Sequence, residues 1–576
     1  MSTIDWLVLA LTLLSIIIYG VWKSKGNKNI DGYLLADKQI PWYGVGLSVM
    51  ATQASAITFL SAPGQAYGDG LRFVQFYFGL PLAMIVLCVT FIPIFHRLKV
   101  YTAYEYLENR FDNKTRSLTA FLFLLQRGLS TGITIYAPSI ILSAILHIDI
   151  TYTTLLIGFI VIMYTVYGGT RAVSYTQMLQ MAIIFSGLLM AGYMVVHMLP
   201  AGVGFTDALH IAGKMGRTNA IDTGFDLNNR YNIWSGLIGG LFLQLSYFGT
   251  DQSQVGRYLT GKSIAQSRLG LVMNGLVKIP MQFLILLIGT LVFAFYQYNA
   301  PPVFFNPVEV ERIESSKYSG EYKKLEGEYL QAHSRKQAEV EKLIPALHRG
   351  DEAAVSQSRT ALQQADKEAT AIRTSVTELM QRANPDADTN DTNYVFLTFV
   401  TTYLPVGMVG LLIAIIFLAS MGSTASGLNS LASTTVIDFY KRFVRTSGTE
   451  HLYLSASRWA TVGWGIFCVV VALYAGRLGN LIEAVNILGS LFYGTILGIF
   501  LVAFYVKKVG GAAVFYAALI AEALVVITWL TDVMAFLWLN VVGCLLVLIL
   551  SLILQKILPN KKPAPYNRAG FRASQN

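Results

Sequence analysis

The chain has 576 residues, of which 54% are hydrophobic and 13% are charged, and its net charge at pH 7 is +10. Soluble domains carry about 25% charged residues, so this composition excludes a soluble globular enzyme. The apolar residues occur in runs of about 20, long enough to cross a bilayer as helices. The positive charge therefore indicates membrane topology and not a nucleic-acid surface.

Hydropathy and run length predict an all-α polytopic protein of the inner or plasma membrane, with about 13 transmembrane helices in contact with lipid. The predicted spans cover approximately residues 4–22, 42–66, 73–96, 117–147, 151–168, 175–198, 232–256, 269–298, 394–425, 456–475, 481–506, 511–531 and 533–556.

Basic residues alternate between the two sides of these spans. The loops after odd-numbered spans contain most of the Lys and Arg, whereas the short loops of opposite parity contain almost none. The positive-inside rule then places the N-terminus outside and the C-terminus in the cytoplasm, which agrees with an odd number of spans. Basic residues on the predicted cytoplasmic side include Lys25, Lys28, Lys38, Lys561, Lys562, Arg568 and Arg572.

Two predicted spans combine glycine with polar side chains. Interrupted helices at corresponding places of two halves are typical of a transporter binding site near the bilayer midplane. Counted from the second span, they are the first and sixth helices of a possible five-plus-five repeat, although we find no convincing sequence identity between the halves. The polar and glycine positions are Gly44, Gly46, Ser48, Thr52, Gln53, Ser55 and Thr58 in the first, and Gly236, Gly239, Gly240, Gln244, Gly249 and Asp251 in the second.

One arginine falls deep within a predicted span. Arg127 lies about 11 residues, or roughly 16 Å, from the start of the span at 117–147. An intramembrane charge at this depth is a candidate for function. Arg127 either approaches an anionic substrate or forms a structural ion pair with Asp251.

The segment from about residue 308 to 387 does not belong in a membrane, because it is rich in Glu, Lys, Gln and Ala. Apolar residues recur in it at helical spacing, and Gly350 with Asp351 offers a turn followed by a helix cap. We expect a helical hairpin on the extracytoplasmic side. It is interpreted as a solvated spacer or a docking element for an extracytoplasmic partner, and not as a catalytic domain.

The stretch from Ile415 to Tyr440 begins as a membrane span and then fills with small hydroxyl residues. On a helix, Ser420, Ser423 and Thr424 share one face. Neutral oxygens in hydrocarbon suit a hard monovalent cation such as sodium. Alternatively, the same small residues are packing contacts between membrane helices.

Several long motifs occur together, in order, over about residues 4–300 and 394–510. They are ATQASAITFLSAPGQAYGDGL, FIPIFHRLKVYTAYEYLENRF, GITIYAPSIIL, YGGTRAVSYTQMLQM, YFGTDQSQVGRYLTGKS and GSTASGLNSLASTTVIDFY. In these motifs the chain resembles the sodium:solute symporters, which carry sugars, sialic acid, proline, iodide, monocarboxylates and vitamins. The resemblance implies a LeuT-type inverted repeat with one extra helix in front, and nothing about the hairpin.

The resemblance also implies a main sodium site. Its ligands, carried over by motif, are carbonyls of Ala51, Ala54 and Ser420 and hydroxyls of Ser423 and Thr424. Some relatives have a second sodium site that needs an aspartate and a serine pair. Here Gln177 replaces the aspartate and the pair becomes Ser426 and Gly427, so we predict one coupled sodium ion per cycle.

Substrate residues follow from the same matching. In sugar carriers of the family the Tyr77 position holds a glutamate, and in sialic acid carriers the Ser130 position holds an arginine that binds the substrate carboxylate. Tyr247 matches the aromatic inner gate. Alternatively, each of these residues makes a hydrogen bond between helices and does not contact the solute. The candidate substrate residues are Gln53, Ser55, Thr58, Tyr77, Arg127, Ser130, Gln244, Tyr247, Asp251, Gln252 and Lys278.

We therefore expect a secondary active symporter of a small polar organic solute, driven by Na⁺ and working by alternating access. An acidic sugar or monocarboxylate is favoured over a neutral sugar or inositol, and a solute sensor without transport is the alternative from another class. No catalytic motif predicts an enzyme. The expected divisions are 1–40 (extra helix and cytoplasmic loop), 41–200 (first repeat), 201–306 and 391–508 (second repeat), 307–390 (hairpin) and 509–576 (C-terminal helices and tail).

Overall fold

The computed structural model describes residues 1–24, 36–98 and 100–558. Regular structure in these ranges is helical, apart from one isolated bridge between Ile40 and Gly261. Ten of the described helices are long and apolar enough to cross a membrane. The predicted all-α membrane architecture is therefore confirmed. Lys25, Lys28, Lys561, Lys562, Arg568 and Arg572, on which the topology prediction partly depends, lie outside the described residues.

The first half of the chain contains α1 (Thr3–Ser24), η1 (Ala36–Lys38), α3 (Trp42–Gln53), α4 (Ala56–Asp69), η2 (Gly70–Tyr77), α5 (Leu80–Val86), η3 (Leu87–Phe91), α6 (Ile92–Leu98), α7 (Glu105–Arg110), α8 (Asn113–Leu146), α9 (Ile150–His197) and α10 (Phe205–Lys214). It continues with η4 (Ser235–Gly239), α11 (Gly240–Thr250), α12 (Gln252–Tyr258) and α13 (Ile264–Tyr298).

The second half contains α14 (Pro307–Glu314), α15 (Ser319–Arg349), α16 (Glu352–Ala383), α17 (Val395–Tyr403), α18 (Met408–Thr434), η5 (Thr435–Val444), α19 (Glu450–Tyr474), η6 (Ala475–Leu478), α20 (Leu481–Tyr505), α21 (Gly511–Leu530) and α22 (Phe536–Ile557).

Ten of the predicted spans match the ten long apolar helices. The other three fall on the shorter apolar stretch Ile150–Val166 and on the two interrupted helices, α3 with α4 and η4 with α11 and α12. The interruptions lie within the two spans whose glycine and polar content predicted them. The number of membrane crossings itself stays a prediction.

Helix α9 contains two predicted spans in one element, and it is not straight. The hydroxyls of Tyr164 and Thr176 lie 2.9 Å apart although twelve residues separate them. A straight helix would place these positions about 18 Å apart along its axis. The chain therefore bends sharply between them, which allows two crossings.

The predicted span at 394–425 is wrong at its start. Helix α17 ends at Tyr403, and α18 begins at Met408 after Pro405 and a left-handed Gly407 (φ +90°). Proline and a positive φ both end a helix. The Asp5 carboxylate of α1 then accepts hydrogen bonds from the amides of Gly407 (2.6 Å) and Gly410 (3.2 Å), which caps α18 and fixes α1 against it.

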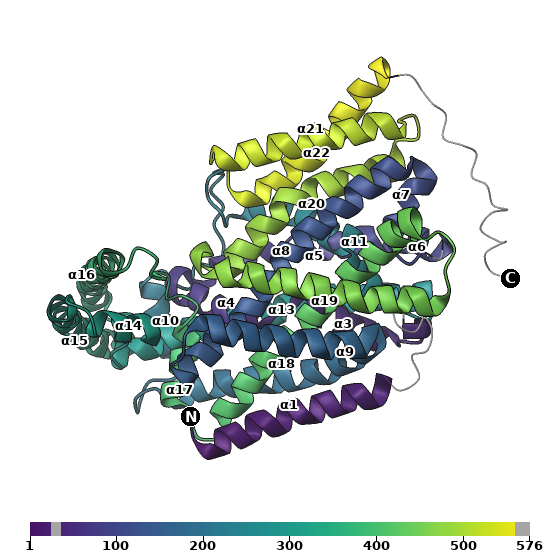
Figure 1. Cartoon of the computed structure of the whole chain (residues 1–576). Helices are drawn as coiled ribbons and strands as arrows, with labels where there is room; N and C mark the ends of the chain where they lie inside the picture. Colours follow the sequence, from purple (N-terminus) through teal and green to yellow (C-terminus); the bar gives the residue numbers. More distant parts are fainter. Residues whose placement is uncertain (25–35, 99, 559–576) are drawn as a thin grey trace.

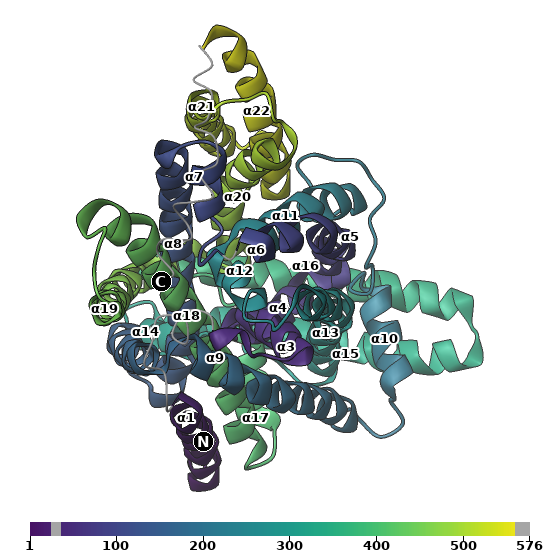
Figure 2. The same ribbon diagram turned by 90° about the vertical axis from the view of Figure 1, so that its right-hand side faces the viewer.

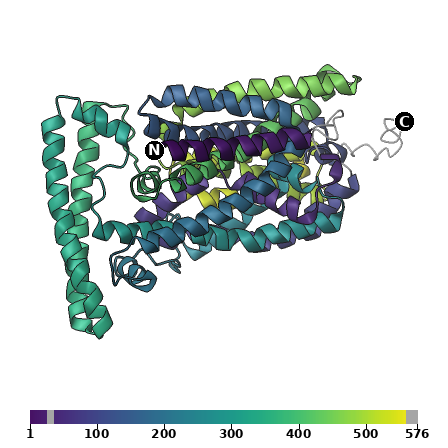
Figure 3. The ribbon, with the colours of Figure 1, turned by 90° about the horizontal axis from the view of Figure 1, so that it is seen from below.

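The helices form one bundle with a hairpin across one end (Figure 1). Figure 2 shows α3 and α4 near the centre, with α1 at one edge and α21 and α22 at the opposite edge. Figure 3 shows α15 and α16 standing across the bundle axis, at the end where α1 begins. The N-terminus and the hairpin thus share one side, as the predicted topology requires.

The hairpin has its own apolar core. Tyr322 and Tyr329 of α15 and Val376 and Leu379 of α16 are buried together, and Ile211 of α10 packs on a second cluster with Leu343. At its base Arg373 forms an ion pair with Asp391 (2.7 Å). Nearby, burial and the neighbouring acids raise the pKa of Asp388 to about 7.

Candidate functional site

The break between α3 and α4 frees two backbone carbonyls. In a continuous helix the amides of Ser55 and Thr58 would donate to Ala51 and Ala54. Here the Ser55 amide donates to the Gln53 carbonyl (3.1 Å), and the Thr58 amide donates to the Ser55 carbonyl (3.0 Å). The Ala51 and Ala54 oxygens lose their helical donors in a buried place, so each favours a cationic partner.

Helix α18 packs against α3 and α4 and supplies hydroxyl oxygens. Thr424 Oγ1 is fully buried and has no hydrogen-bond partner among the described residues. Ser423 Oγ donates to the carbonyls of Ala419 (3.0 Å) and Ser420 (3.1 Å), which leaves its lone pairs available. Freed carbonyls and an unpartnered hydroxyl, with no net charge among them, fit a sodium ion.

The positions that hold a second sodium ion in some relatives are otherwise engaged. Gln177 Oε1 accepts from Ser48 Oγ (2.6 Å), and its Nε2 donates to the Gly422 carbonyl (3.1 Å) and to Thr52 Oγ1 (3.3 Å). A Cβ at Gly427 would lie 2.5 Å from the Thr131 hydroxyl, so there is no room for a side chain.

Arg257 occupies the remaining hydroxyl of that set. Its Nε donates to Ser426 Oγ (3.0 Å), which also lies 3.1 Å from Thr52 Oγ1. A guanidinium is always protonated in proteins, so it repels a second cation at this hydroxyl. Arg257 was not among the site residues predicted from the sequence, and this contact was not anticipated.

A cavity of about 100 Å³ lies beside the predicted sodium site, between the broken α3–α4 pair, α8, α11 and α20. Seven candidate substrate residues line it, and so does Ser423. The seven are Gln53, Ser55, Thr58, Tyr77, Arg127, Ser130 and Tyr247. The structure therefore brings together residues that are up to about 200 positions apart in the sequence.

Four other candidate residues do not line this cavity. Gln252 turns away: its Oε1 accepts from the Ala103 amide (3.0 Å), and its Nε2 donates to the Tyr101 carbonyl (2.8 Å). Gln244 and Lys278 are fully buried, and their side-chain polar atoms have no hydrogen-bond partner in the part of the chain that the structure describes.

Lys278 lies just behind the cavity wall. Its Nζ is 5.9 Å from the centre of the Tyr77 ring, which itself lines the cavity. Among the described residues, this ring contact is the one interaction of the Lys278 amine. The amine therefore lies close to the cavity and has no acidic partner among the described residues.

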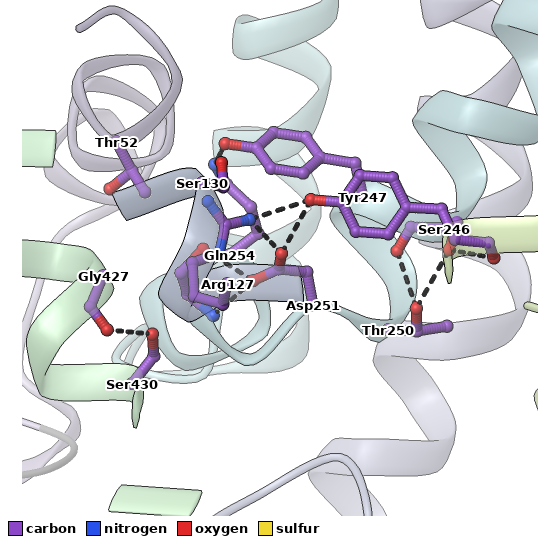
Figure 4. Close-up of polar contacts among 12 residues, drawn as sticks. Thr52, Arg127, Ser130, Ser246, Tyr247, Thr250, Asp251, Gln254, Gly427 and Ser430 are labelled. Atoms are coloured by element: carbon purple, nitrogen blue, oxygen red, sulfur yellow. Dashed lines mark hydrogen bonds and ion pairs between the residues drawn. The ribbon is translucent and has the colours of Figure 1, made fainter. Parts of the chain in front are cut away.

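Asp251 lies at the break between α11 and α12 and forms an ion pair with Arg127 (Figure 4). Arg127 Nη2 also donates to Tyr493 Oη (2.9 Å), and that hydroxyl donates to Asp251 Oδ2 (2.9 Å). Ser253 donates to Asp251 Oδ1 through its amide (2.8 Å) and its hydroxyl (2.6 Å). The structural ion pair is thus formed.

Arg127 nevertheless lines the cavity, and its Nε has no partner among the described residues. The Tyr247 ring lies 5.5 Å from the guanidinium carbon, and its hydroxyl accepts from Gln254 Nε2 (2.6 Å). Tyr247 also contacts Tyr493, with ring centres 5.8 Å apart. Its role as a gate stays a prediction.

Four polar residues of the cavity wall were missed from the sequence: Thr131, Thr134, Asn486 and Tyr493. Asn486 and Tyr493 lie on α20, which reads as an apolar span. The polar side chain of Asn486 within this apolar run was the one feature of the sequence that could have indicated a site on α20. Thr131 and Thr134 follow Ser130 by one and four positions, which helical spacing could have indicated.

The family model described as "Sodium:solute symporter family" matches residues 33–317 and 375–521. The chain belongs to this family. The symporter match leaves out residues 318–374, which form most of the hairpin. The chain is accordingly a sodium-coupled solute symporter of the membrane, and the expectation that it is a transporter and not an enzyme agrees with the names of its relatives.

Two named relatives cover most of the chain, and a third covers about half of it. It is 27% identical over 523 residues to a sodium/glucose cotransporter of Vibrio parahaemolyticus, which covers 88% of this chain and 82% of that protein. It is 24% identical over 559 residues to the sodium/sialic acid symporter SiaT of Proteus mirabilis, covering 95% and 93%. It is 33% identical over 276 residues to the human sodium/iodide cotransporter, covering 47% and 42%.

A solved structure confirms the fold. It is a substrate-bound, outward-open state of a Na⁺-coupled sialic acid symporter, with a TM-score of 0.75 and 22% identity, covering 98% of this chain and 99% of that chain. The LeuT-type fold expected from the sequence is therefore shown. The domain boundaries and the side of the membrane on which the hairpin lies stay predictions.

Proposed function

We propose that this symporter couples one Na⁺ per cycle to the uptake of a small anionic organic solute, an acidic sugar or a monocarboxylate. The ion is held by Ala51, Ala54, Ser420, Ser423 and Thr424. The observation that carries the sodium site is the buried, unpartnered Thr424 hydroxyl opposite a helix break that frees two carbonyls. A single site is supported by Gln177, whose amide is already hydrogen-bonded, and by Arg257 at Ser426.

The charge around the cavity favours an anionic solute. Arg127 lines the cavity and is paired with Asp251, and the Lys278 amine lies behind Tyr77. An unpaired charge is costly in this buried place, so a carboxylate of the solute would offset the charge of a protonated Lys278. The unpartnered Arg127 Nε supplies a donor for that carboxylate.

Sodium binding would order the break between α3 and α4, because the same segment supplies two ion ligands and cavity residues Gln53, Ser55 and Thr58. Solute affinity then depends on sodium by linkage. Tyr247 would close over the bound solute, and movement of the helices would release both ligands to the cytoplasm.

A neutral sugar or inositol is the second candidate. The observation that favours it is the ion pair of Arg127 with Asp251, which already satisfies much of the guanidinium charge. The hydroxyl groups of Thr58, Ser130 and Thr134 would then bind solute hydroxyls. A solute sensor that binds without transport is the alternative from another class.

Uptake into proteoliposomes separates these functions. An inward Na⁺ gradient should drive accumulation of a labelled acidic solute. Replacing Arg127 alone leaves Asp251 unpaired, so the informative variant is Arg127→Gln with Asp251→Asn, which removes both charges. We expect it to fold and to lose uptake of acidic solutes at least about tenfold. Unchanged acidic uptake in this double variant would remove Arg127 from the solute site. Uptake of a neutral sugar but of no acidic solute by the wild-type chain would favour the neutral-sugar function.

The proposed orientation has the N-terminus and hairpin outside and the C-terminus in the cytoplasm. The three native cysteines are buried, so single engineered cysteines report the side of the membrane. Glu352→Cys, at an exposed position beside the hairpin turn, should react with an impermeant thiol reagent added outside intact cells. Reaction only after the cells are permeabilised would show that the hairpin lies on the cytoplasmic side. An extracytoplasmic partner of the hairpin is part of this proposal.

A further inference from the structure

A smaller cavity lies between α12 and α18. Its lining residues on α18 follow the predicted sodium ligands along the helix, toward its C-terminal end. The volume of the cavity is about 20 Å³. Apart from Gly256, its lining is polar: Gln252, Ser253, Arg257, Ser426, Asn429, Ser430 and Ser433. Neither the sodium site nor the solute cavity explains this cavity.

Arg257 brings an uncompensated charge to it. The residue is 3% exposed. Its Nε donates to Ser426 Oγ (3.0 Å) and its Nη1 to Ser174 Oγ (3.4 Å). No carboxylate lies within ion-pair distance of it in the ranges that the structure describes. A buried guanidinium that bonds only neutral oxygens retains most of its desolvation cost.

Buried arginines elsewhere in the fold do have such partners. Arg127 is paired with Asp251, and Arg116 with Asp438 at 2.7 Å. In both of these cases the fold supplies an acid next to the buried arginine. At Arg257 the counter-charge must come from elsewhere.

Asn429 supplies the second donor. It is 4% exposed, lines the cavity, and neither of its side-chain amide atoms has a hydrogen-bond partner among the described residues. The serine hydroxyls, by contrast, donate to the backbone: Ser430 to the Gly427 carbonyl (2.7 Å; Figure 4) and Ser433 to the Ser430 carbonyl (3.0 Å). The donors left for a ligand are therefore the guanidinium and the amide.

We propose that this cavity binds a monatomic anion, chloride, between Arg257 and Asn429. A volume of this size holds about one water-sized body, so a monatomic halide fits it better than an organic acid does. The anion neutralises Arg257, accepts from the Asn429 amide, and joins α12 to α18. A cation is repelled by the same guanidinium.

The test compares chloride with gluconate, an anion too large for the cavity, at constant Na⁺ and ionic strength. The readout is the thermal unfolding midpoint of the full-length chain purified in detergent, which does not require transport. We expect chloride to raise the midpoint saturably, by at least about 2 °C. Lys262→Gln, at an exposed position nearby, should keep this response.

Asn429→Asp places a tethered carboxylate beside Arg257. It should be stable in gluconate and lose the response to chloride. Arg257→Gln should lose it as well, and if that variant does not fold, Asn429→Asp still decides. Equal midpoints of the wild-type chain in chloride and gluconate would overturn the proposal and leave water in the cavity. An unchanged chloride response in Asn429→Asp would overturn it too, because the anion would then bind elsewhere.

Discussion

Helix α18 carries two polar regions made of the same residue types but surrounded differently. The first, with Ser423 and Thr424, faces the freed carbonyls of the α3–α4 break. The second, with Ser426 and Ser430, faces the guanidinium of Arg257. The hydroxyls alone do not select an ion. The neighbouring carbonyls favour a cation in one region, and the neighbouring arginine favours an anion in the other.

The largest expected effect comes from removing one hydroxyl group from the first region. Thr424→Ala removes a ligand oxygen, so the Na⁺ concentration for half-maximal uptake should rise at least about tenfold, or about 1.4 kcal/mol. Thr424→Ser keeps the oxygen and should change it little. Thr434→Ala is the matched control, since its hydroxyl is also buried without a described partner on the same helix. Equal sodium dependence in the Thr424 and Thr434 variants would remove Thr424 from the site.

Gly427 lies within the second region, and a side chain there should destabilise the fold. Gly427→Ser would bring Cβ to 2.5 Å from Thr131 Oγ1. Overpacking of this kind costs about 1–3 kcal/mol of folding free energy. The double variant Gly427→Ser with Thr131→Ala should recover most of it in thermal unfolding. No recovery would show that the clash lies elsewhere.

Gln177→Asp tests whether the second region can be turned into a sodium site. We expect the Hill coefficient for Na⁺ to stay near one, because Arg257 still donates to Ser426. Uptake should fall a few-fold, since the new carboxylate cannot donate to the Gly422 carbonyl as the Gln177 amide does. A Hill coefficient near two would contradict the role given to Arg257.

The smallest expected effect is that of pH on sodium dependence. None of the five proposed sodium residues is titratable, so the Na⁺ concentration for half-maximal uptake should change less than about twofold between pH 6 and 8.

Asp388 in the hairpin does titrate in this pH range, because burial raises its pKa to about 7. In the folded chain Asp388 keeps a proton that it releases near pH 4 in the unfolded chain. The free energy of unfolding therefore falls as pH rises from about 4 to 7. Asp388→Asn should abolish that fall in thermal unfolding, and a fall that persists would assign it to another group.

The sequence predicted the parts of the fold that depend on local composition. Apolar runs located the helices, glycine and polar residues located both interruptions, and Gly350 with Asp351 located the turn between α15 and α16. The start of α18 was missed because the apolar run continues through α17. Pro405 and Gly407 interrupt the helix within that run.

The candidate site was predictable where a motif fixed it and less so where packing decides. Motif matching named Ser423 and Thr424, and the depth of Arg127 in its span raised its pairing with Asp251 as an alternative. Gln252 was placed with the solute, whereas the structure turns it toward Ala103. The contact of Arg257 with Ser426 joins residues 169 positions apart, and only the folded chain brings them together.

The most direct test of the account is equilibrium binding of ²²Na⁺ to the purified full-length chain, which needs no knowledge of the solute. The account predicts one saturable ion per chain in the wild type, and affinity at least about tenfold weaker in Thr424→Ala. Two ions per chain, or one ion with unchanged affinity in Thr424→Ala, would contradict it.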